Sequence, residues 1–298
     1  SQTNQIVIGY EGRGLGSNTV VLGNSSIVTT RLQGNVGIGT DVPSAELDVV
    51  GKIHLNDGGN SVFVGTNAGF LDDGTDNKNV GVGYTALRLN TTGAYNTATG
   101  YSALYSNTIG TNNTANGYYA LHSNTTGTNN TANGLFSLRL NTTGNYNTAN
   151  GATALNSNTS GLRNTASGYQ AGRYTNAGAE VTVTNNSVFI GYDTRANADS
   201  QTNQIVIGSE AIGLGSNTVV LGNSSIVTTR LQGNVGIGTD VPSAELDVVG
   251  KIALNDGGDS VFIGINPGLN DDASDNRNVG VGQAALRENT TGGSNTAT

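Results

Sequence analysis

The 298-residue sequence has no cysteine, methionine or tryptophan, only three prolines, and few charged or aromatic residues. Without cysteine the chain can form neither a disulfide framework nor a thiolate metal site. No apolar run approaches the roughly 18 residues of a membrane-spanning helix, so the sequence predicts no membrane segment. The formal net charge is −8 and clusters of Lys and Arg are missing, which argues against nucleic acid as a partner.

Charged residues make up only 11% of the chain and aromatic residues 5%, a composition that disordered chains can share. Short runs of β-branched residues indicate ordered strands instead, as in Ile6-Val7-Ile8 and Val62-Phe63-Val64. Glycine supplies 45 residues but does not fall at every third position, which excludes collagen. We therefore expect an ordered, glycine-rich β protein.

A long tandem repeat organises the chain. Residues 200–298 repeat residues 1–99 at an offset of 199 positions, with 18 of the 99 aligned positions different and no insertion. A tandem array lengthens an object, whereas an active site needs one copy, so we expect a segment of a longer fibrous protein. The predicted organisation is one full unit at 1–199 and a partial second copy at 200–298. Within the unit we place strand-rich rows at 1–30, a connector at 31–60, a regular roll at 61–178 and a lead into the next unit at 179–199. Inside the connector, Pro43 predicts a turn at 40–44, and the alternation at 47–49 and 52–55 predicts a strand with one buried face.

A second period of 17 residues is nested in the first, and each of its rows opens on an asparagine. Each row combines β-forming residues with Gly and Asn, which accept the left-handed backbone of tight corners. Stacking the rows at about 4.8 Å would place Asn over Asn and Thr over Thr in ladders. The sequence thus predicts an all-β parallel β-solenoid, or β-roll, with 17-residue coils. The six opening residues are Asn79, Asn96, Asn113, Asn130, Asn147 and Asn164.

One leucine per row forms a further column, and we expect it to be the core of a homotrimer. Each 17-residue row offers only about two large apolar groups, whereas ordering costs 1–2 kcal/mol per residue, so burial between identical chains would supply what one chain lacks. The predicted trimer core is Leu87, Leu104, Leu121, Leu138 and Leu155.

Several segments resemble known families. Asn60-Ser61-Val62-Phe63-Val64-Gly65 and Asn186-Ser187-Val188-Phe189-Ile190-Gly191 are similar to the N-S-V-A-I-G rows in the β-roll heads of trimeric autotransporter adhesins. The stretch from Ser17 to Ser26 and that from Gly34 to Val49 resemble connectors of phage tail fibres and large bacterial surface proteins. The resemblance implies threefold symmetry, an intertwined or side-by-side homotrimer, and a location outside the cell, on the cell surface or in a virion.

Three functions follow from these features. The first is a structural or adhesive extracellular fibre, a rigid stalk or filament whose partners are further copies of itself, neighbouring filaments, or a host surface glycan or protein. The alternative is a phage tail-fibre shaft carrying a receptor-binding tip. The third is an enzyme, such as a polysaccharide lyase, but lyases need clustered acids and bases that the sequence lacks, so we expect no catalytic residue and no cofactor.

Two acidic loops are the only candidate metal sites, because several hard oxygen ligands in a short loop can hold Ca²⁺. We favour solvated turns there, since neither the helix-flanked calcium loop nor the glycine-aspartate nonapeptide is present. His54 becomes Ala253 in the second copy, so we assign no metal to it, nor to His122. The calcium candidates are Asp72, Asp73, Asp76, Asp271, Asp272 and Asp275.

Other motifs have simpler interpretations. Gly12-Arg13-Gly14-Leu15-Gly16 superficially resembles a phosphate-binding loop, but no helix is expected after it, so we predict a corner. Glycosylation motifs begin at Asn90, Asn124, Asn141 and Asn158, which also fall at ladder positions. The column Thr97, Thr114, Thr131, Thr148 and Thr165 is too narrow for an ice-binding face, and we expect a structural ladder. Contact with a glycan or another filament is expected of Tyr105, Tyr119, Arg139 and Tyr146.

Overall fold

The computed structural model describes residues 5–8, 19–22, 36–38, 45, 47–49, 60–75, 77–249, 261–263, 278–288, 290 and 294–298. Within these residues the chain is all-β, with parallel strands and no helix. It divides into two units, Ser1–Ser225 and Ile226–Thr298. The strands of the first unit are β1 (Gln5–Ile8), β2 (Thr19–Leu22), β3 (Val36–Ile38), β4 (Leu47–Val49), β5 (Val62–Val64), β6 (Val80–Val82), β7 (Thr97–Thr99), β8 (Thr114–Asn116), β9 (Thr131–Asn133), β10 (Thr148–Asn150), β11 (Thr165–Ser167), β12 (Val188–Ile190), β13 (Ile205–Ile207) and β14 (Val219–Leu221).

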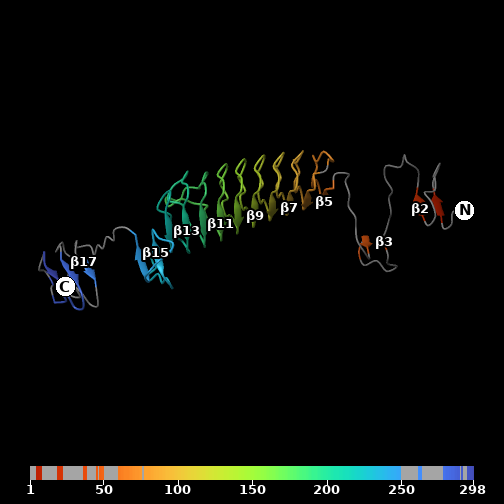
Figure 1. Cartoon of the computed structure of the whole chain (residues 1–298). Coiled ribbons are helices and arrows are strands. Elements are labelled where there is room, and N and C mark those ends of the chain that lie inside the picture. The colour runs from red at the N-terminus through yellow and green to blue at the C-terminus, as the bar shows by residue number, and fades with distance from the viewer. Residues whose placement is uncertain are drawn as a thin grey trace. The chain divides into compact units, whose positions relative to one another are not determined.

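A parallel ten-stranded sheet runs in chain order from β5 to β14, one strand per coil (Figure 1). From β6 to β11 each strand pairs with the residues 17 positions further on, as Thr97 pairs with Thr114 and Ala98 with Ala115. The predicted parallel β-solenoid with 17-residue coils is therefore confirmed.

The strand pattern explains which way each side chain points. In β8 the middle residue, Ala115, is fully buried, whereas Thr114 and Asn116 face outward. Successive strand residues point to opposite faces, so one small residue per coil enters the interior. Glycine ends each strand because the coils are tightly stacked there. A Cβ on Gly83, whose φ is +135°, would lie 2.4 Å from the carbonyl oxygen of Gly100.

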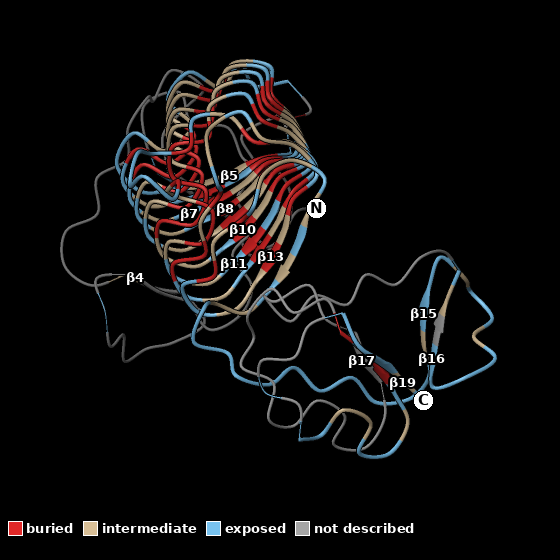
Figure 2. Ribbon diagram, turned by 90° about the vertical axis from the view of Figure 1, so that its left-hand side faces the viewer, coloured by how far each residue is buried: buried red, intermediate tan, exposed pale blue. Residues whose placement is uncertain are grey.

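The leucine column lies inside the chain. One buried cluster contains these leucines and the alanines of the same coils, and every leucine in it is 0% exposed in a single chain: Leu87, Leu104, Leu121, Leu138 and Leu155. The buried segments of successive coils, drawn red, lie side by side along the stack (Figure 2). The placement of these leucines between three chains is therefore wrong. Each coil closes around its own leucine and leaves no part of it for a partner.

This inward turn strains the backbone. The five leucines have φ between 46° and 52°, the left-handed region that side chains with a Cβ disfavour. The conformation costs roughly 1–2 kcal/mol per residue, whereas full burial of a leucine side chain contributes about 1.5–3 kcal/mol. Burial thus offsets the strain.

Two asparagine ladders fill the rest of the interior. In the first, the side-chain oxygen of Asn96 accepts a hydrogen bond from the backbone N–H of Asn113 at 3.0 Å, while its Nδ2 donates to the carbonyl of Gly110 at 2.8 Å. In the second, Asn124 Nδ2 donates to Asn107 Oδ1 at 2.8 Å. Both columns are fully buried. The prediction of Asn stacked over Asn is confirmed, and these bonds satisfy polar groups that would otherwise be costly to bury.

At the ends of the leucine column, a phenylalanine ring packs against a glycine. Gly172 occupies the position of leucine in its coil, and a Cβ there would lie 2.8 Å from Phe189 Cδ2 and 3.0 Å from Leu155 Cδ2. Phe63 similarly lies 2.5 Å from the Cβ position of Gly69. In these coils glycine stands at the leucine position, and the phenylalanine ring from a strand fills the space that a leucine side chain would occupy.

The sheet does not follow the boundaries of the sequence repeat. β11 and β12 are offset by 23 residues, and the added residues form a projecting loop in which Tyr174 and Glu180 make an antiparallel bridge. β12 then pairs with β13 across the predicted unit boundary at 199/200. The ladder continues through that boundary, so the 199-residue unit is a period of the sequence and not a separate folded body.

The other strands form smaller sheets. β1 pairs with β2, as expected for strand-rich rows at 1–30, and β3 pairs with β4, which confirms the predicted strand at 47–49. The second unit contains the pair β15 (Val235–Ile237) and β16 (Leu246–Val248), and a three-stranded sheet of β17 (Val261–Ile263), β18 (Val279–Val281) and β19 (Thr296–Ala297). The predicted turn at 40–44 and strand at 52–55 lie outside the described residues.

Candidate functional site

An array of exposed rings follows the strands of successive coils. Tyr84, Tyr101 and Tyr118 come directly after the strand-ending glycines, and their ring centroids are 5.0 and 5.1 Å apart with interplanar angles of 20° and 19°. The spacing of the stacked rings is that of the coils themselves. All three side chains remain over 40% exposed, so the array lies on the surface.

A second group of rings extends this array toward the residues that follow it in each coil. Tyr119 lies 4.5 Å from Tyr118 in an edge-on arrangement and 4.6 Å from His122. The His122 ring in turn stacks on Tyr105 at 5.1 Å with an interplanar angle of 8°. Phe136 closes the group against Tyr118 at 5.5 Å. One continuous set of ring contacts therefore spans four coils.

Two arginines lie within this set. Arg88 donates from Nη1 to the hydroxyl of Tyr105 at 2.9 Å, and the guanidinium of Arg139 lies 5.1 Å from the centre of the Phe136 ring. Such cation–π contacts hold an arginine over a ring while its remaining donors stay available. We call this surface the corner stripe and define it as Tyr84, Arg88, Tyr101, Tyr105, Tyr118, Tyr119, His122, Phe136 and Arg139.

Burial and neighbouring groups shift the pKa values of two side chains in the corner stripe. Burial lowers the pKa of His122 below its ordinary value, and the positive charge of Arg139 lowers it further. Burial raises the pKa of Tyr101, with a further contribution from Tyr119, Tyr84 and Tyr118. His122 is therefore a neutral side chain at pH 7, and the Tyr101 hydroxyl keeps its proton.

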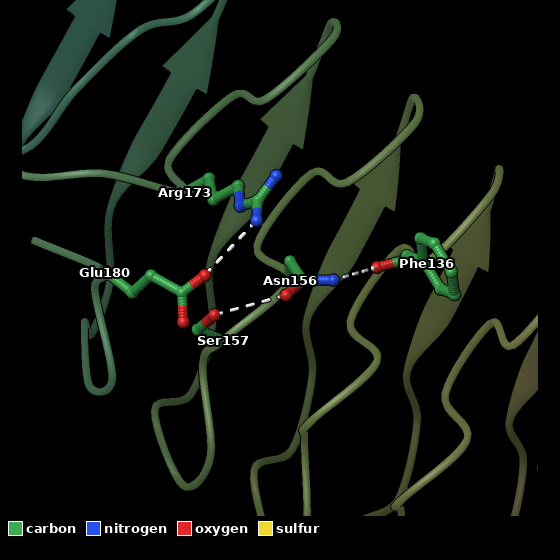
Figure 3. Close-up of polar contacts among 5 residues, drawn as sticks. All are labelled: Phe136, Asn156, Ser157, Arg173 and Glu180. Atoms are coloured by element: carbon green, nitrogen blue, oxygen red, sulfur yellow. Dashed lines mark hydrogen bonds and ion pairs between the residues drawn. The ribbon is translucent and has the colours of Figure 1, made fainter. Parts of the chain in front are cut away.

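Beyond the corner stripe, a polar network marks the projecting loop. Arg173 Nη2 contacts Glu180 Oε1 at 3.2 Å, Ser157 Oγ donates to Asn156 Oδ1 at 3.2 Å, and Asn156 Nδ2 donates to the carbonyl of Phe136 at 2.9 Å (Figure 3). A hydrogen bond from Ser157 lowers the pKa of Glu180 against the opposing effect of burial, and Arg173 adds to the lowering. The loop thus carries its own ion pair.

The acidic loop before β6 uses its carboxylates internally. Asp73 Oδ1 accepts hydrogen bonds from the backbone N–H and the hydroxyl of Thr75 at 3.0 and 2.7 Å, and from Asn77 Nδ2 at 3.0 Å. These bonds, led by the Thr75 hydroxyl, lower the pKa of Asp73. Asp72 Oδ1 accepts the N–H of Gly74 at 3.0 Å. In the described part of the chain no three His, Asp or Glu side chains gather as metal ligands. Asp76, Asp271, Asp272 and Asp275 lie outside the described residues.

The remaining predicted sites separate into ladder positions and surface positions. The glycosylation motifs at Asn90, Asn124, Asn141 and Asn158 place their amides in the interior, where each Nδ2 donates to the glycine carbonyl three residues on. The strand threonines at 97, 114, 131, 148 and 165 stack outward in register. His54 and the loop at 12–16 lie outside the described residues.

Of the four residues expected to contact a glycan or filament, the structure brings three into the corner stripe: Tyr105, Tyr119 and Arg139. Tyr146 lies apart from them and contacts Arg163, whose guanidinium is 6.0 Å from its ring centre. Sequence reasoning missed Tyr84, Tyr101, Tyr118, His122, Phe136 and Arg88 as members of the same surface.

A signal for this surface is nonetheless present in the sequence. No Asp or Glu occurs between residues 77 and 179, which hold five of the 13 Lys and Arg residues: Lys78, Arg88, Arg139, Arg163 and Arg173. The remaining positions carry eight Lys and Arg against all 21 Asp and Glu, a net charge of 8 − 21 = −13. The acidic chain therefore contains a cationic block of coils.

Together, fold and surface define a parallel β-solenoid that carries an aromatic and cationic stripe along one corner. Comparison with protein-family models, with curated proteins and with solved structures found no match. Among the described residues, no helix is long and apolar enough to cross a bilayer.

Proposed function

We propose that this chain is a structural or adhesive segment of an extracellular fibre and that it is not an enzyme. The observation that supports the proposal most strongly is the stacking itself, since each coil from β5 to β14 pairs only with its neighbours. The length of such a ladder grows with the number of coils. Ten coils at about 4.8 Å per step give an axial length of roughly 43 Å for this stack.

The proposed fibre is a homotrimer, but its interface cannot be the buried leucine column. The outward face of the sheet offers an alternative, because it is apolar at both ends and polar in the middle. Val64, Val80 and Val82 are 37–46% exposed at one end, and Val219 and Leu221 are 62% and 53% exposed at the other. The central strands carry Thr and Asn at the same positions.

The tandem repeat reproduces these apolar belts. Ile6 and Ile8 on β1 are 53% and 59% exposed, and Val279 and Val281 on β18 are 38% and 39% exposed. Identical chains that run in parallel and in register would place each belt against the same belt of the neighbouring chain. Association would then bury the exposed apolar surface that a single chain leaves in water.

The test is to convert one belt into the sequence of the central strands. Val219→Thr with Leu221→Asn gives β14 the outward residues of β8 while leaving the inward-facing Val220 intact. Light scattering should give about three times the chain mass of 30.2 kDa for the parent and a smaller assembly for the variant. The matched control is Thr131→Ser on the polar centre, which should keep the parent mass. A monomeric parent at micromolar concentration would rule out the trimer.

Electron microscopy tests the fibre itself. We expect a thin, straight rod whose axial period, in chains with more copies of the repeat, is set by the 199-residue unit. A compact globule, or a string of beads without continuous β structure, would contradict the proposal.

A further inference from the structure

Two arginines of the cationic block, Arg88 and Arg139, have no carboxylate within ion-pair distance in the described part of the chain. The segment from 77 to 179 has no acidic residue. Arg139 also keeps its Nε shielded and without a hydrogen-bond partner among the described residues. An anionic ligand at the surface would pair with the outer nitrogens of these guanidinium groups, since the buried Nε of Arg139 is out of its reach.

The stacking of the rings determines how such a ligand would be bound. Tyr84, Tyr101 and Tyr118 cover one another's faces, and each residue remains over 40% exposed. Ring edges carry positive electrostatic potential, and the hydroxyls are hydrogen-bond donors. The corner stripe therefore presents a row of donors to oxygen atoms, and it offers few open ring faces on which planar bases could stack.

The spacing of the cations distinguishes between classes of polyanion. Arg88 and Arg139 are 51 residues apart, which is three 17-residue coils, or roughly 14 Å along the axis. A nucleic acid strand carries a charge about every 3.4 Å, and its binding sites neutralise many successive phosphates. A polysaccharide with a charge on every second sugar has more widely separated charges and many hydroxyl groups between them.

From these observations we propose that the corner stripe binds an acidic polysaccharide, a sugar polymer bearing carboxylate or sulfate groups. Arg88 and Arg139 would each pair with one anionic group, since a guanidinium can donate two parallel hydrogen bonds to a carboxylate or sulfate. The tyrosine hydroxyls between them would donate to sugar oxygens. The chain then runs along the solenoid axis and contacts successive coils.

The experiment measures binding of the purified whole chain to hyaluronan and to chondroitin sulfate oligosaccharides by titration calorimetry in low-salt buffer. We expect Arg88→Gln and Arg139→Gln to weaken binding by roughly tenfold each, the loss of a charge-assisted interaction. The matched control is Arg163→Gln, which removes the same charge from a coil corner that precedes β11 and lies apart from the stripe. This variant should bind within about twofold of the parent, since added distance and salt screen its charge.

Three outcomes would overturn the proposal. Binding of neither oligosaccharide would do so, as would equal losses for Arg163→Gln and Arg88→Gln, which would show attraction to net charge alone. Tighter binding of a single-stranded oligo(dT) than of either sugar would assign the stripe to nucleic acid. Neutral dextran serves as the negative probe, and circular dichroism confirms that each variant keeps its β structure.

Discussion

Replacing Leu121 by Asp should unfold its coil and should not release folded single chains from an assembly. Leu121 is 0% exposed within one chain. The substitution forfeits about 1.5–3 kcal/mol of leucine burial and adds the several kcal/mol needed to bury an unpaired charge. That sum is comparable with the 5–15 kcal/mol that typically stabilises a domain. Circular dichroism should show lost β structure or a sharply lower melting temperature.

Smaller substitutions at the same site test the backbone argument. Leu121→Ala should destabilise the chain by about 2–5 kcal/mol through the cavity that it leaves. Leu121→Gly leaves at least the same cavity, but glycine tolerates the φ of 49° that costs other residues about 1–2 kcal/mol. Since glycine also loses roughly 0.5–1 kcal/mol in chain entropy, the glycine variant should be at least as stable as the alanine variant.

Leu135 provides the matched control, because it is a leucine of the adjacent segment that is 46% exposed. Leu135→Ala should change stability by no more than about 0.5 kcal/mol. A Leu121→Asp protein that stays folded at 30.2 kDa, while the parent is a trimer, would restore the leucine column to the interface between chains. An alanine variant more stable than the glycine variant by 1 kcal/mol would refute the argument from strain.

Two further predictions concern protons and metal. Because the pKa of His122 is lowered in the folded state, the unfolded chain takes up its proton first as pH falls through the ordinary value of 6.5, so the parent should lose melting temperature between pH 8 and pH 5 relative to His122→Gln. A pH-independent difference between the two proteins would contradict this. Adding EGTA should leave most of the melting temperature intact, since Asp72 and Asp73 already accept hydrogen bonds within their loop. A large fall, reversed by Ca²⁺ and absent in Asp72→Asn with Asp76→Asn, would show a calcium site.

The coil could be predicted from the sequence because the residues that repeat every 17 positions, such as asparagine, have the same structural role in each coil. Asn96 and Asn113, 17 positions apart, could be placed one above the other before any coordinates, and the structure joins them through a hydrogen bond of 3.0 Å. The strand at 47–49 was equally predictable from its alternation. Register and strand position follow from spacing alone.

The direction of the leucine column could not be predicted in the same way. A 17-residue period predicts that the leucines stack. It does not predict whether they point into the coil or out toward solvent. The outcome depends on the left-handed backbone at Leu104 and its equivalents, a conformation that sequence statistics assign to glycine or asparagine. The estimate of a thin core also omitted the interior asparagines, whose ladders satisfy buried polar groups without further apolar area.

The corner stripe was missed for a different reason. Tyr101, Tyr119 and His122 fall at three different positions of the row, and only the closed coil brings their rings into contact. No linear motif connects them. The absence of acidic residues from 77 to 179 was visible, but its meaning requires knowing that these residues share one stack.

The division between repeated and varied positions indicates where function resides in such a fold. Asparagine, glycine and the inner alanine are nearly fixed from coil to coil, because each is held by contacts to the coil above and the coil below. The position that bears Arg88, Tyr105, His122 and Arg139 changes in every coil, although it lies at one corner of an otherwise uniform stack. A ladder requires no such variation, and a single structural role would be met by one residue type. The varied corner can therefore be changed without loss of the coil, which makes it the surface on which a uniform fibre can acquire a binding specificity.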